Sequence, residues 1–278
     1  MMKPFVQRHH HGGPVKAVIL DWAGTTVDYG CMGPVAAFLE VFCRHGVEVT
    51  VEEARAPMGM MKKDHLRFMC HMESISLKWR ERHGRPPTEQ DVDVMYGELE
   101  PMMVSSIAAY SDLIPGVLGT VSELRSRGIK IGSTTGYSRP IMEILTKEAA
   151  RRGYQPDVVV CPTDVPAGRP LPYMCYQNAI RLEVYPLEAI VKIGDTVVDI
   201  EEGLNAGMWT VGVTKTGSEL GLPEREVAKM DQETLKYELA TVRKKFLETG
   251  CHEVVEGIYD CVRIIDEINV RLARGEAP

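Results

Sequence analysis

Short apolar runs recur along the chain, and each ends in small or polar residues. The first, Val15 to Leu20, is followed by Asp21, and a later one, Ile190 to Ile193, is followed by Gly194 and Asp195. Continuous runs of this length are typical of parallel strands that are buried on both faces. From residue 110 onward they alternate with stretches of helical periodicity. The pattern predicts an α/β fold with a doubly wound, Rossmann-like parallel sheet, whose strands lie at 15–20, 129–131, 158–160, 190–193 and 209–213.

The interval between the first two predicted strands is too long for a single crossover. Roughly 110 residues separate Asp21 from Ile131, whereas a strand–helix–strand unit usually takes about 30. The sequence in between has helical periodicity that is interrupted by Pro and Gly. The organisation that we expect is a flexible N-terminal tail (1–14), a core (15–32 and 110–278, with one or two charged helices after 223) and an inserted helical cap domain (33–109).

The composition is that of an ordinary globular protein. The 278 residues are 44% hydrophobic and 26% charged, and 32 Lys and Arg against 39 Asp and Glu give a formal net charge of −7. This charge excludes a general attraction to nucleic acid or anionic lipid. Without a signal-peptide pattern or an apolar run that can span a bilayer, a cytoplasmic location is expected. Seven scattered cysteines without a CxxC pair indicate free thiols, and the histidines at 9–11 are interpreted as part of the tail.

Polar residues that suit phosphoryl chemistry follow several predicted strands, at the edge where open parallel sheets bind ligands. Asp21 precedes a Gly-Thr turn that can hold a phosphoryl group beside a carboxylate nucleophile. Thr135 and the amide of Gly136 can bind phosphate oxygens, and Arg169, in a proline-rich loop, can neutralise them. Each motif alone also fits a plain turn, so the prediction of a phosphoryl-transfer site depends on their convergence.

Two carboxylates four positions apart, Asp195 and Asp199, follow the fourth predicted strand. Such hard oxygen ligands suit Mg²⁺, although Asp195 alone also fits a helix cap. With this last motif, the order of the loops resembles the haloacid dehalogenase superfamily of phosphotransferases. The resemblance implies an aspartyl phosphate on Asp21 and phosphate contacts from Thr135 and from Arg169, where most members carry lysine. It also implies Mg²⁺ bound by Asp21, Asp195 and a main-chain oxygen near Ala23, with Asp199 supporting the metal.

One position departs from the pattern of that superfamily. Most of its phosphatases have a second acid two residues after the nucleophile, which protonates a departing alkoxide, but this chain has Ala23 there. Either phosphatase activity is lost, or the leaving group needs no acid at that place. A carbon leaving group is such a case, because a lysine that condenses with a β-aldehyde converts the departing carbanion into a neutral enamine. Lys62 and His65 share a face of a predicted cap helix with Met58, although that segment alone is more typical of a solvated charged helix.

Four segments together resemble a narrower group, the phosphonoacetaldehyde hydrolase family. They read DWAGTTVDYG from Asp21, MGMMKKDHLR from Met58, GSTTGY from Gly132 and DVPAGRP from Asp164. The resemblance implies hydrolysis of the carbon–phosphorus bond of phosphonoacetaldehyde, a small-molecule phosphonate, to acetaldehyde and phosphate. It further implies a homodimer joined through the cap helices. The implied site residues are Asp21 as nucleophile, Lys62 as the Schiff-base residue, His65 as an acid–base group, and Met58, Cys31 and Tyr137 near the substrate.

Two other functions stay open at this point. A phosphate-ester hydrolase or phosphomutase on the same fold would keep Asp21 and make Lys62 dispensable. A catalytically silent protein that binds a phosphorylated ligand would explain the missing second acid. The choice of Lys62 over the adjacent Lys63 rests on helical register and on the resemblance.

Overall fold

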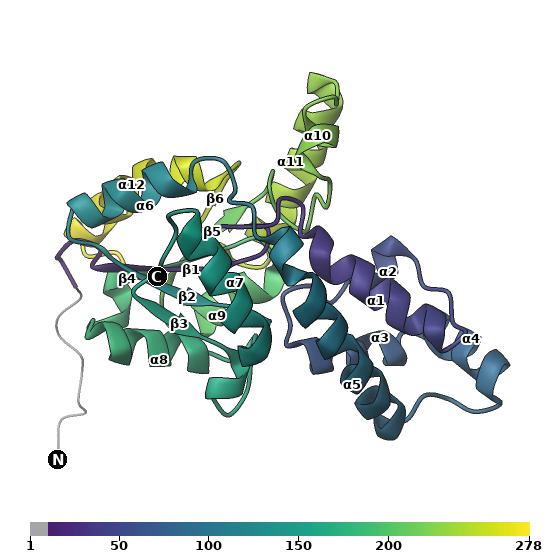
Figure 1. The fold of residues 1–278 in the computed structure, drawn as a ribbon. Helices are drawn as coiled ribbons and strands as arrows, with labels where there is room; N and C mark the ends of the chain where they lie inside the picture. The colour runs from purple at the N-terminus through teal and green to yellow at the C-terminus, as the bar shows by residue number, and fades with distance from the viewer. Residues whose placement is uncertain (1–10) are drawn as a thin grey trace, which may run out of the picture.

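The computed structural model describes residues 11–278 and contains a six-stranded parallel sheet (Figure 1). The strand order is β3-β2-β1-β4-β5-β6, so that the first strand lies near the middle and later strands are added on both sides. In the pairing of β1 with β4, Leu20 lies opposite Ile193, which brings Asp21 and Gly194 to the same edge. The predicted doubly wound parallel sheet is therefore confirmed. The strands are β1 (Ala17–Leu20), β2 (Lys130–Thr134), β3 (Val158–Val160), β4 (Ile190–Gly194), β5 (Trp209–Val213) and β6 (Glu253–Val255).

The sixth strand was not predicted. β6 lies in the segment after 223, for which the sequence indicates only helices, and that prediction is incomplete. The strand is three residues long, which is too short to show a strand periodicity, and it extends the sheet by pairing with β5. The same segment also forms the helices α10 (Glu224–Val227), α11 (Gln232–Glu248) and α12 (Cys261–Ala273).

Helices cover both faces of the sheet. α8 (Tyr173–Leu182) and α9 (Val197–Asn205) pack on one face, whereas α6 (Val117–Ser126) and α12 cover the other (Figure 1). α7 (Arg139–Arg151), which follows β2, packs against the last helix of the insert. Because β1, β4 and β5 are buried along their whole lengths, their apolar runs form the centre of the core.

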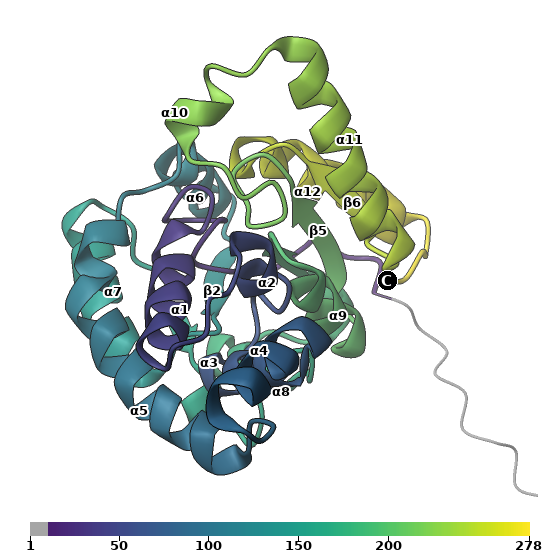
Figure 2. The same ribbon diagram turned by 90° about the vertical axis from the view of Figure 1, so that its right-hand side faces the viewer.

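The long interval between β1 and α6 forms a group of helices beside the sheet, as predicted (Figures 1 and 2). The first and last of them pack together, and the second and third pack against the first and the last, respectively. The division of the chain at 33 and 109 stays a prediction, and residues 1–10 of the predicted tail lie outside the described residues. The helices are α1 (Met32–Arg44), α2 (Val51–Arg55), α3 (Lys62–His71), α4 (Glu73–His83) and α5 (Glu89–Ser106), followed by the 3-10 turn η1 (Ile107–Tyr110).

Two sequence-based expectations concern the chain as a whole. The seven cysteines are unpaired, as predicted. Within residues 11–278, no helix has both the length and the apolar character that crossing a bilayer requires. The cytoplasmic location stays a prediction.

A buried carboxylate fixes the junction between β1 and the insert. Asp28 and Cys31 adopt left-handed backbone conformations with φ of 54° and 53°. The Asp28 carboxylate accepts hydrogen bonds from the amides of Met32 (3.0 Å) and Gly33 (2.9 Å), which begin α1. These amides have no partner within the helix, so the carboxylate satisfies them in a buried place. Burial raises the pKa of Asp28 to about 6, against the effect of these two hydrogen bonds.

The substitution Asp28→Asn should change how stability depends on pH. Between pH 4 and 7 the folded protein must ionise a buried carboxyl with a pKa of about 6, whereas the unfolded chain ionises it near 3.8. The unfolded chain therefore binds fewer protons in this window, and wild-type stability falls as the pH rises. The difference in free energy of unfolding, Asp28→Asn minus wild type, should therefore be about 2 kcal/mol more positive at pH 7 than at pH 4. Urea unfolding of both proteins at both pH values measures this change, and a difference that does not vary with pH would contradict it.

Candidate active site

A small cavity lies where the carboxyl edge of the sheet meets the insert. Its volume is about 20 Å³, which is room for about one water molecule. Ten of its twelve lining residues are site residues predicted from the sequence, and they come from motifs far apart in the chain. Two further predicted residues, His65 and Asp199, are buried but do not line it. The lining consists of Asp21, Ala23, Cys31, Met58, Gly59, Lys62, Thr135, Gly136, Tyr137, Arg169, Asp195 and Thr196.

Asp21 directly follows β1, in a turn that backbone hydrogen bonds hold in place. Its amide donates to the carbonyl of Ile193 (2.9 Å), and the carbonyl of Trp22 accepts from three amides of the turn. The next residue, Ala23, lines the cavity and brings no acid. Gly24 has a φ of 88°, and a Cβ at this position would overlap the Asp195 carboxylate. The glycine therefore allows the turn to approach the second acidic motif closely.

Asp195 and Asp199 have different surroundings, although both are buried. Asp195 accepts hydrogen bonds from the Thr25 hydroxyl (3.1 Å) and from the amide of Ser218 (2.7 Å). Asp199 accepts from Lys192 Nζ (2.5 Å) and from the Thr196 hydroxyl (2.6 Å). Both carboxylate oxygens of Asp199 are thus bound to protein donors, which suits the supporting position that the sequence predicts for this residue.

Arg169 connects Asp21 to the acidic residues Asp199 and Glu202. Its Nη2 donates to Asp21 Oδ1 (2.7 Å) and to the Thr134 hydroxyl (2.7 Å). Its Nη1 lies 3.0 Å from Asp199 Oδ1 and donates to the carbonyl of Gly59 (3.4 Å), and its Nε donates to Glu202 (2.9 Å). All three nitrogens of the guanidinium are therefore engaged, and the Gly59 contact reaches into the insert.

The buried cluster carries more negative than positive charge. The cations of Arg169 and Lys192 pair with Asp21, Asp199 and Glu202, and Asp195 lies beside the other two aspartates. These six side chains together carry a formal charge of −2. Burial and the charge of Asp199 raise the pKa of Asp21, and burial and the charge of Asp21 raise that of Asp195.

Oxygens of Asp21, Asp195 and Asp199 lie within 4.8 Å of one another. Hard oxygen donors in this arrangement fit Mg²⁺, whose charge equals the negative excess of the cluster.

Lys62, at the start of α3, reaches the cavity from the insert. It is 5% exposed, and its Nζ lies 4.9 Å from the ring centre of Tyr137 and 5.8 Å from that of Phe38. Burial lowers the pKa of Lys62, assisted by the charge of Arg169 and opposed by Asp21 and Asp195. The adjacent Lys63 instead forms an ion pair with Asp93 (2.6 Å) at the surface. The amine inside the cavity is therefore that of Lys62.

His65 lies one turn along α3, behind the cavity. Its ring stacks on Phe38, with centroids 3.8 Å apart, and its Nε2 lies 2.9 Å from the carbonyl of Ala54. A carbonyl only accepts, so Nε2 carries the hydrogen and Nδ1 keeps a lone pair. Nδ1 is buried and has no hydrogen-bond partner among residues 11–278. Burial and the charge of Lys62 lower the pKa of His65 well below its ordinary value, so the ring is neutral.

The remaining predicted residues form the walls of the cavity. Cys31, Met58 and Tyr137 are buried, and burial raises the pKa of the Cys31 thiol and of the Tyr137 phenol. The Thr135 hydroxyl accepts from the amide of Tyr137 (3.1 Å). At Gly136, a Cβ would overlap the carbonyl of Met60. Glycine therefore allows the core to approach the loop that precedes Lys62.

The sequence reasoning missed the polar residues behind the cavity. Lys192 and Glu202 are fully buried and contact Arg169 or Asp199, and Thr134 contacts Arg169. A lysine within the otherwise apolar run Ile190 to Ile193 is a signal that could have identified one of them, because an unpaired buried ammonium is unstable. Glu202 looks like an ordinary helical glutamate in the sequence.

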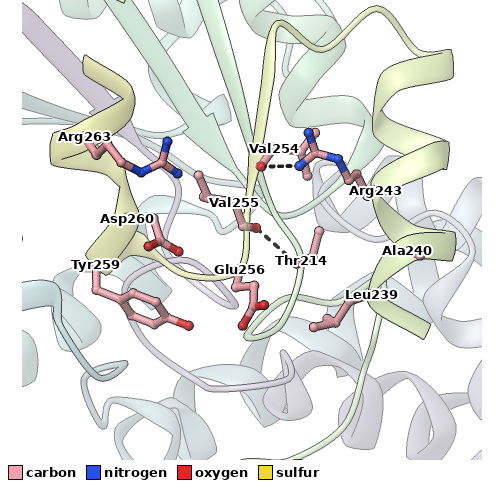
Figure 3. A pocket seen from close by; sticks show the side chains of 10 residues that line it. All are labelled: Thr214, Leu239, Ala240, Arg243, Val254, Val255, Glu256, Tyr259, Asp260 and Arg263. Atoms are coloured by element: carbon pink, nitrogen blue, oxygen red, sulfur yellow. Dashed lines mark hydrogen bonds between the residues drawn. The ribbon is translucent and has the colours of Figure 1, made fainter. Parts of the chain in front are cut away.

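A larger cavity lies elsewhere, among α11, β6 and the start of α12 (Figure 3). Its volume is about 570 Å³, and its side chains include Arg243, Glu256, Asp260 and Arg263. Arg243 donates to the carbonyl of Val254 (2.6 Å) within it. None of the sequence-predicted site residues lines this cavity. We place the candidate site at the smaller cavity because the buried charges converge there.

Comparisons with known proteins show the family to which the chain belongs. A family model described as haloacid dehalogenase-like hydrolase matches residues 15–207. The chain is 57% identical over 277 residues to a phosphonoacetaldehyde hydrolase of Syntrophobacter fumaroxidans, with both chains covered completely.

Two further relatives extend the comparison. A bifunctional phosphonoacetaldehyde hydrolase/aminoethylphosphonate transaminase of Clostridioides difficile is 50% identical over 93% of this chain and 41% of its own. The crystal structure of a phosphonoacetaldehyde hydrolase-like protein from Oleispira antarctica matches with a TM-score of 0.96 and 39% identity, covering 100% of both chains. The chain therefore belongs to the phosphonoacetaldehyde hydrolase family of the haloacid dehalogenase-like hydrolases.

Proposed function

We propose that the protein is a Mg²⁺-dependent hydrolase that cleaves phosphonoacetaldehyde to acetaldehyde and phosphate. The observation that carries the proposal is a buried lysine amine, that of Lys62, in the same small cavity as the carboxylate of Asp21. Ala23 occupies the place of an alkoxide-protonating acid, which a carbon leaving group does not need. The names of the relatives support the same substrate. A transaminase acting on aminoethylphosphonate would supply the aldehyde, because transamination converts a primary amine into a carbonyl group.

The first step is imine formation at Lys62. The neutral amine attacks the aldehyde carbon, and the carbonyl oxygen leaves as water, so that an iminium links substrate and enzyme. Burial of Lys62 favours the neutral amine that this attack requires. His65 lies one helical turn from the amine, and its Nδ1 keeps a lone pair without another partner among residues 11–278, which supports an acid–base role in this step.

The second step is cleavage of the carbon–phosphorus bond. A carboxylate oxygen of Asp21 attacks phosphorus, and the electron pair of the breaking bond moves into the iminium to give a neutral enamine. Arg169 and the backbone at Thr135 and Gly136 would hold the phosphoryl oxygens. When bound, Mg²⁺ would supply positive charge that reduces repulsion between Asp21 and the anionic substrate. It would be held by Asp21, Asp195 and the main chain at Ala23, with Asp199 in support.

The last steps release both products. The enamine takes a proton at carbon, and water hydrolyses the resulting iminium to acetaldehyde and the free amine of Lys62. A second water attacks the aspartyl phosphate, which restores Asp21 and releases phosphate. Because a cavity of about 20 Å³ cannot admit the substrate, we further propose that the insert, 33–109, opens and closes as a cap over the core formed by 15–32 and 110–278.

We also propose a homodimer that forms through the cap helices. Large apolar side chains on three of these helices are about half exposed, namely Phe68 (48%), Leu77 (50%) and Val94 (50%). Contiguous exposed apolar area marks surfaces that pair with another chain, and the proposed dimer would cover these side chains.

The first prediction tests the role of Lys62. Lys62→Arg keeps a positive charge but cannot form an imine, so release of phosphate from phosphonoacetaldehyde should fall by about a thousandfold or more. Lys63→Arg is the matched control and should stay within about threefold of wild type, because surface ion pairs contribute little. Borohydride added with substrate should trap an adduct on wild type and on Lys63→Arg, and mass spectrometry should locate it at Lys62. An active wild-type enzyme that yields no adduct would remove the imine step.

The second prediction concerns the metal and uses stability as its readout. Mg²⁺ should raise the melting temperature of the wild-type protein, because a ligand that binds only the folded state stabilises it. Asp195→Asn should abolish this shift. Asp266→Asn, which changes a surface carboxylate that pairs with Arg127, should keep it. Equal shifts in all three proteins, measured by calorimetry with and without chelator, would show that Mg²⁺ binds elsewhere.

The third prediction tests the dimer. Leu77→Glu places a charge on the exposed face of α4 and should lower the dimer fraction in sedimentation velocity. Ile180→Glu, on α8 of the core, is the control, since Ile180 is also apolar and 70% exposed. If Ile180→Glu alone produces monomer, the dimer forms through the core instead.

A further inference from the structure

Glu202 is a buried carboxylate that the proposed reaction does not use. It lies on α9, is fully buried and does not line the cavity. Its Oε2 accepts from Arg169 Nε (2.9 Å) and from the Thr134 hydroxyl (3.0 Å), and Lys192 Nζ lies 3.6 Å away. Burying an ionised carboxylate costs several kcal/mol. These partners explain how the folded protein tolerates the charge of Glu202, but they do not explain its role.

The geometry of Arg169 indicates the contribution. Asp199 and Glu202 are three residues apart on α9 and so lie on one face of the helix. They bind Nη1 and Nε of the guanidinium, respectively, and Nη2 is left to reach Asp21. Because a guanidinium is planar, two fixed nitrogens determine the position of the third.

We propose that Glu202 is a positioning residue that orients Arg169 toward Oδ1 of Asp21 and the phosphoryl oxygens. The inference rests on the proposed function, because it assigns Arg169 to the phosphoryl group. The Nε contact is specific to arginine, since a lysine at this position would carry only a terminal ammonium. Glu202 acts through this contact, whereas Asp199 also supports the acidic cluster.

If Glu202 has this role, its substitution should affect turnover and substrate binding differently. Glu202→Gln keeps the shape and an acceptor oxygen but removes one negative charge beside Arg169. The positive charge that faces the substrate is then less compensated, so binding of an anion should be maintained or improved. The orientation of the guanidinium, however, is held less firmly, so turnover should fall. Loss of a comparable supporting contact in metal sites costs about 10- to 100-fold.

The experiment measures kcat and KM for phosphonoacetaldehyde in Mg²⁺ buffer. We expect Glu202→Gln to lower kcat about 10- to 100-fold, with KM unchanged or lower. Glu201→Gln, which changes a half-buried neighbour on the same helix, is the matched control and should behave as wild type. If Glu202→Gln does not fold, Glu202→Asp, which retains the charge but withdraws the oxygen from Nε, takes its place with the same expected loss of kcat.

A double-mutant cycle with Arg169→Lys provides the decisive test. If Glu202 acts through Nε, adding Glu202→Gln to Arg169→Lys should cost less than about threefold in kcat. An equal loss in both backgrounds, or a folded Glu202→Gln with wild-type kcat, would overturn the proposal. Wild-type turnover tests the proposed function separately. Absence of phosphate release from wild type refutes that function, whereas normal wild-type release with unchanged Glu202→Gln kinetics refutes only the role of Glu202.

Discussion

The carboxyl edge of the sheet depends on one buried cation, the guanidinium of Arg169, which lies among several carboxylates. Without Arg169, the carboxylates of Asp21, Asp199 and Glu202 would face one another in a water-poor interior. Desolvation costs several kcal/mol for each buried ion, and only close opposite charge with good hydrogen bonds repays it. Lys192 provides the second compensating charge from inside β4. A bound divalent cation would offset the negative charge that remains.

The same desolvation has opposite effects on the two groups that the proposed reaction brings together. It raises the pKa of Asp21 and lowers that of Lys62. A neutral amine suits attack on an aldehyde, whereas an ionised carboxylate suits attack on phosphorus. Desolvation therefore favours the neutral form of Lys62 that the reaction uses. The ionised form of Asp21, in contrast, has to be stabilised by positive charge nearby. Arg169 provides part of that charge, and a bound cation would provide the rest.

Most residues that line the cavity could be predicted from the sequence, but the buried residues behind them could not. Continuous apolar runs predicted the strands of the sheet. Residues that follow these strands, such as Asp21 and Thr135, line the cavity because parallel strands end at one edge. Glu202 could not be foreseen, since its neighbours in space come from β2, β4 and a distant loop. β6 was missed because three residues show no period. The helical register favoured Lys62 over Lys63, but only the packing of α3 shows which amine is buried.

Arg169 also links the core to the insert. All three of its nitrogens are engaged in the described structure, so a phosphonate oxygen can bind the guanidinium only by replacing an existing partner. The longest of these hydrogen bonds, 3.4 Å, goes to the carbonyl of Gly59, three residues before Lys62. Movement of the insert would break this bond and withdraw the lysine together, because both lie on the same short segment. In the proposed reaction, opening would free a donor for the phosphonate, and closing would return the amine to the carbonyl carbon, so that one displacement would act at both ends of the substrate.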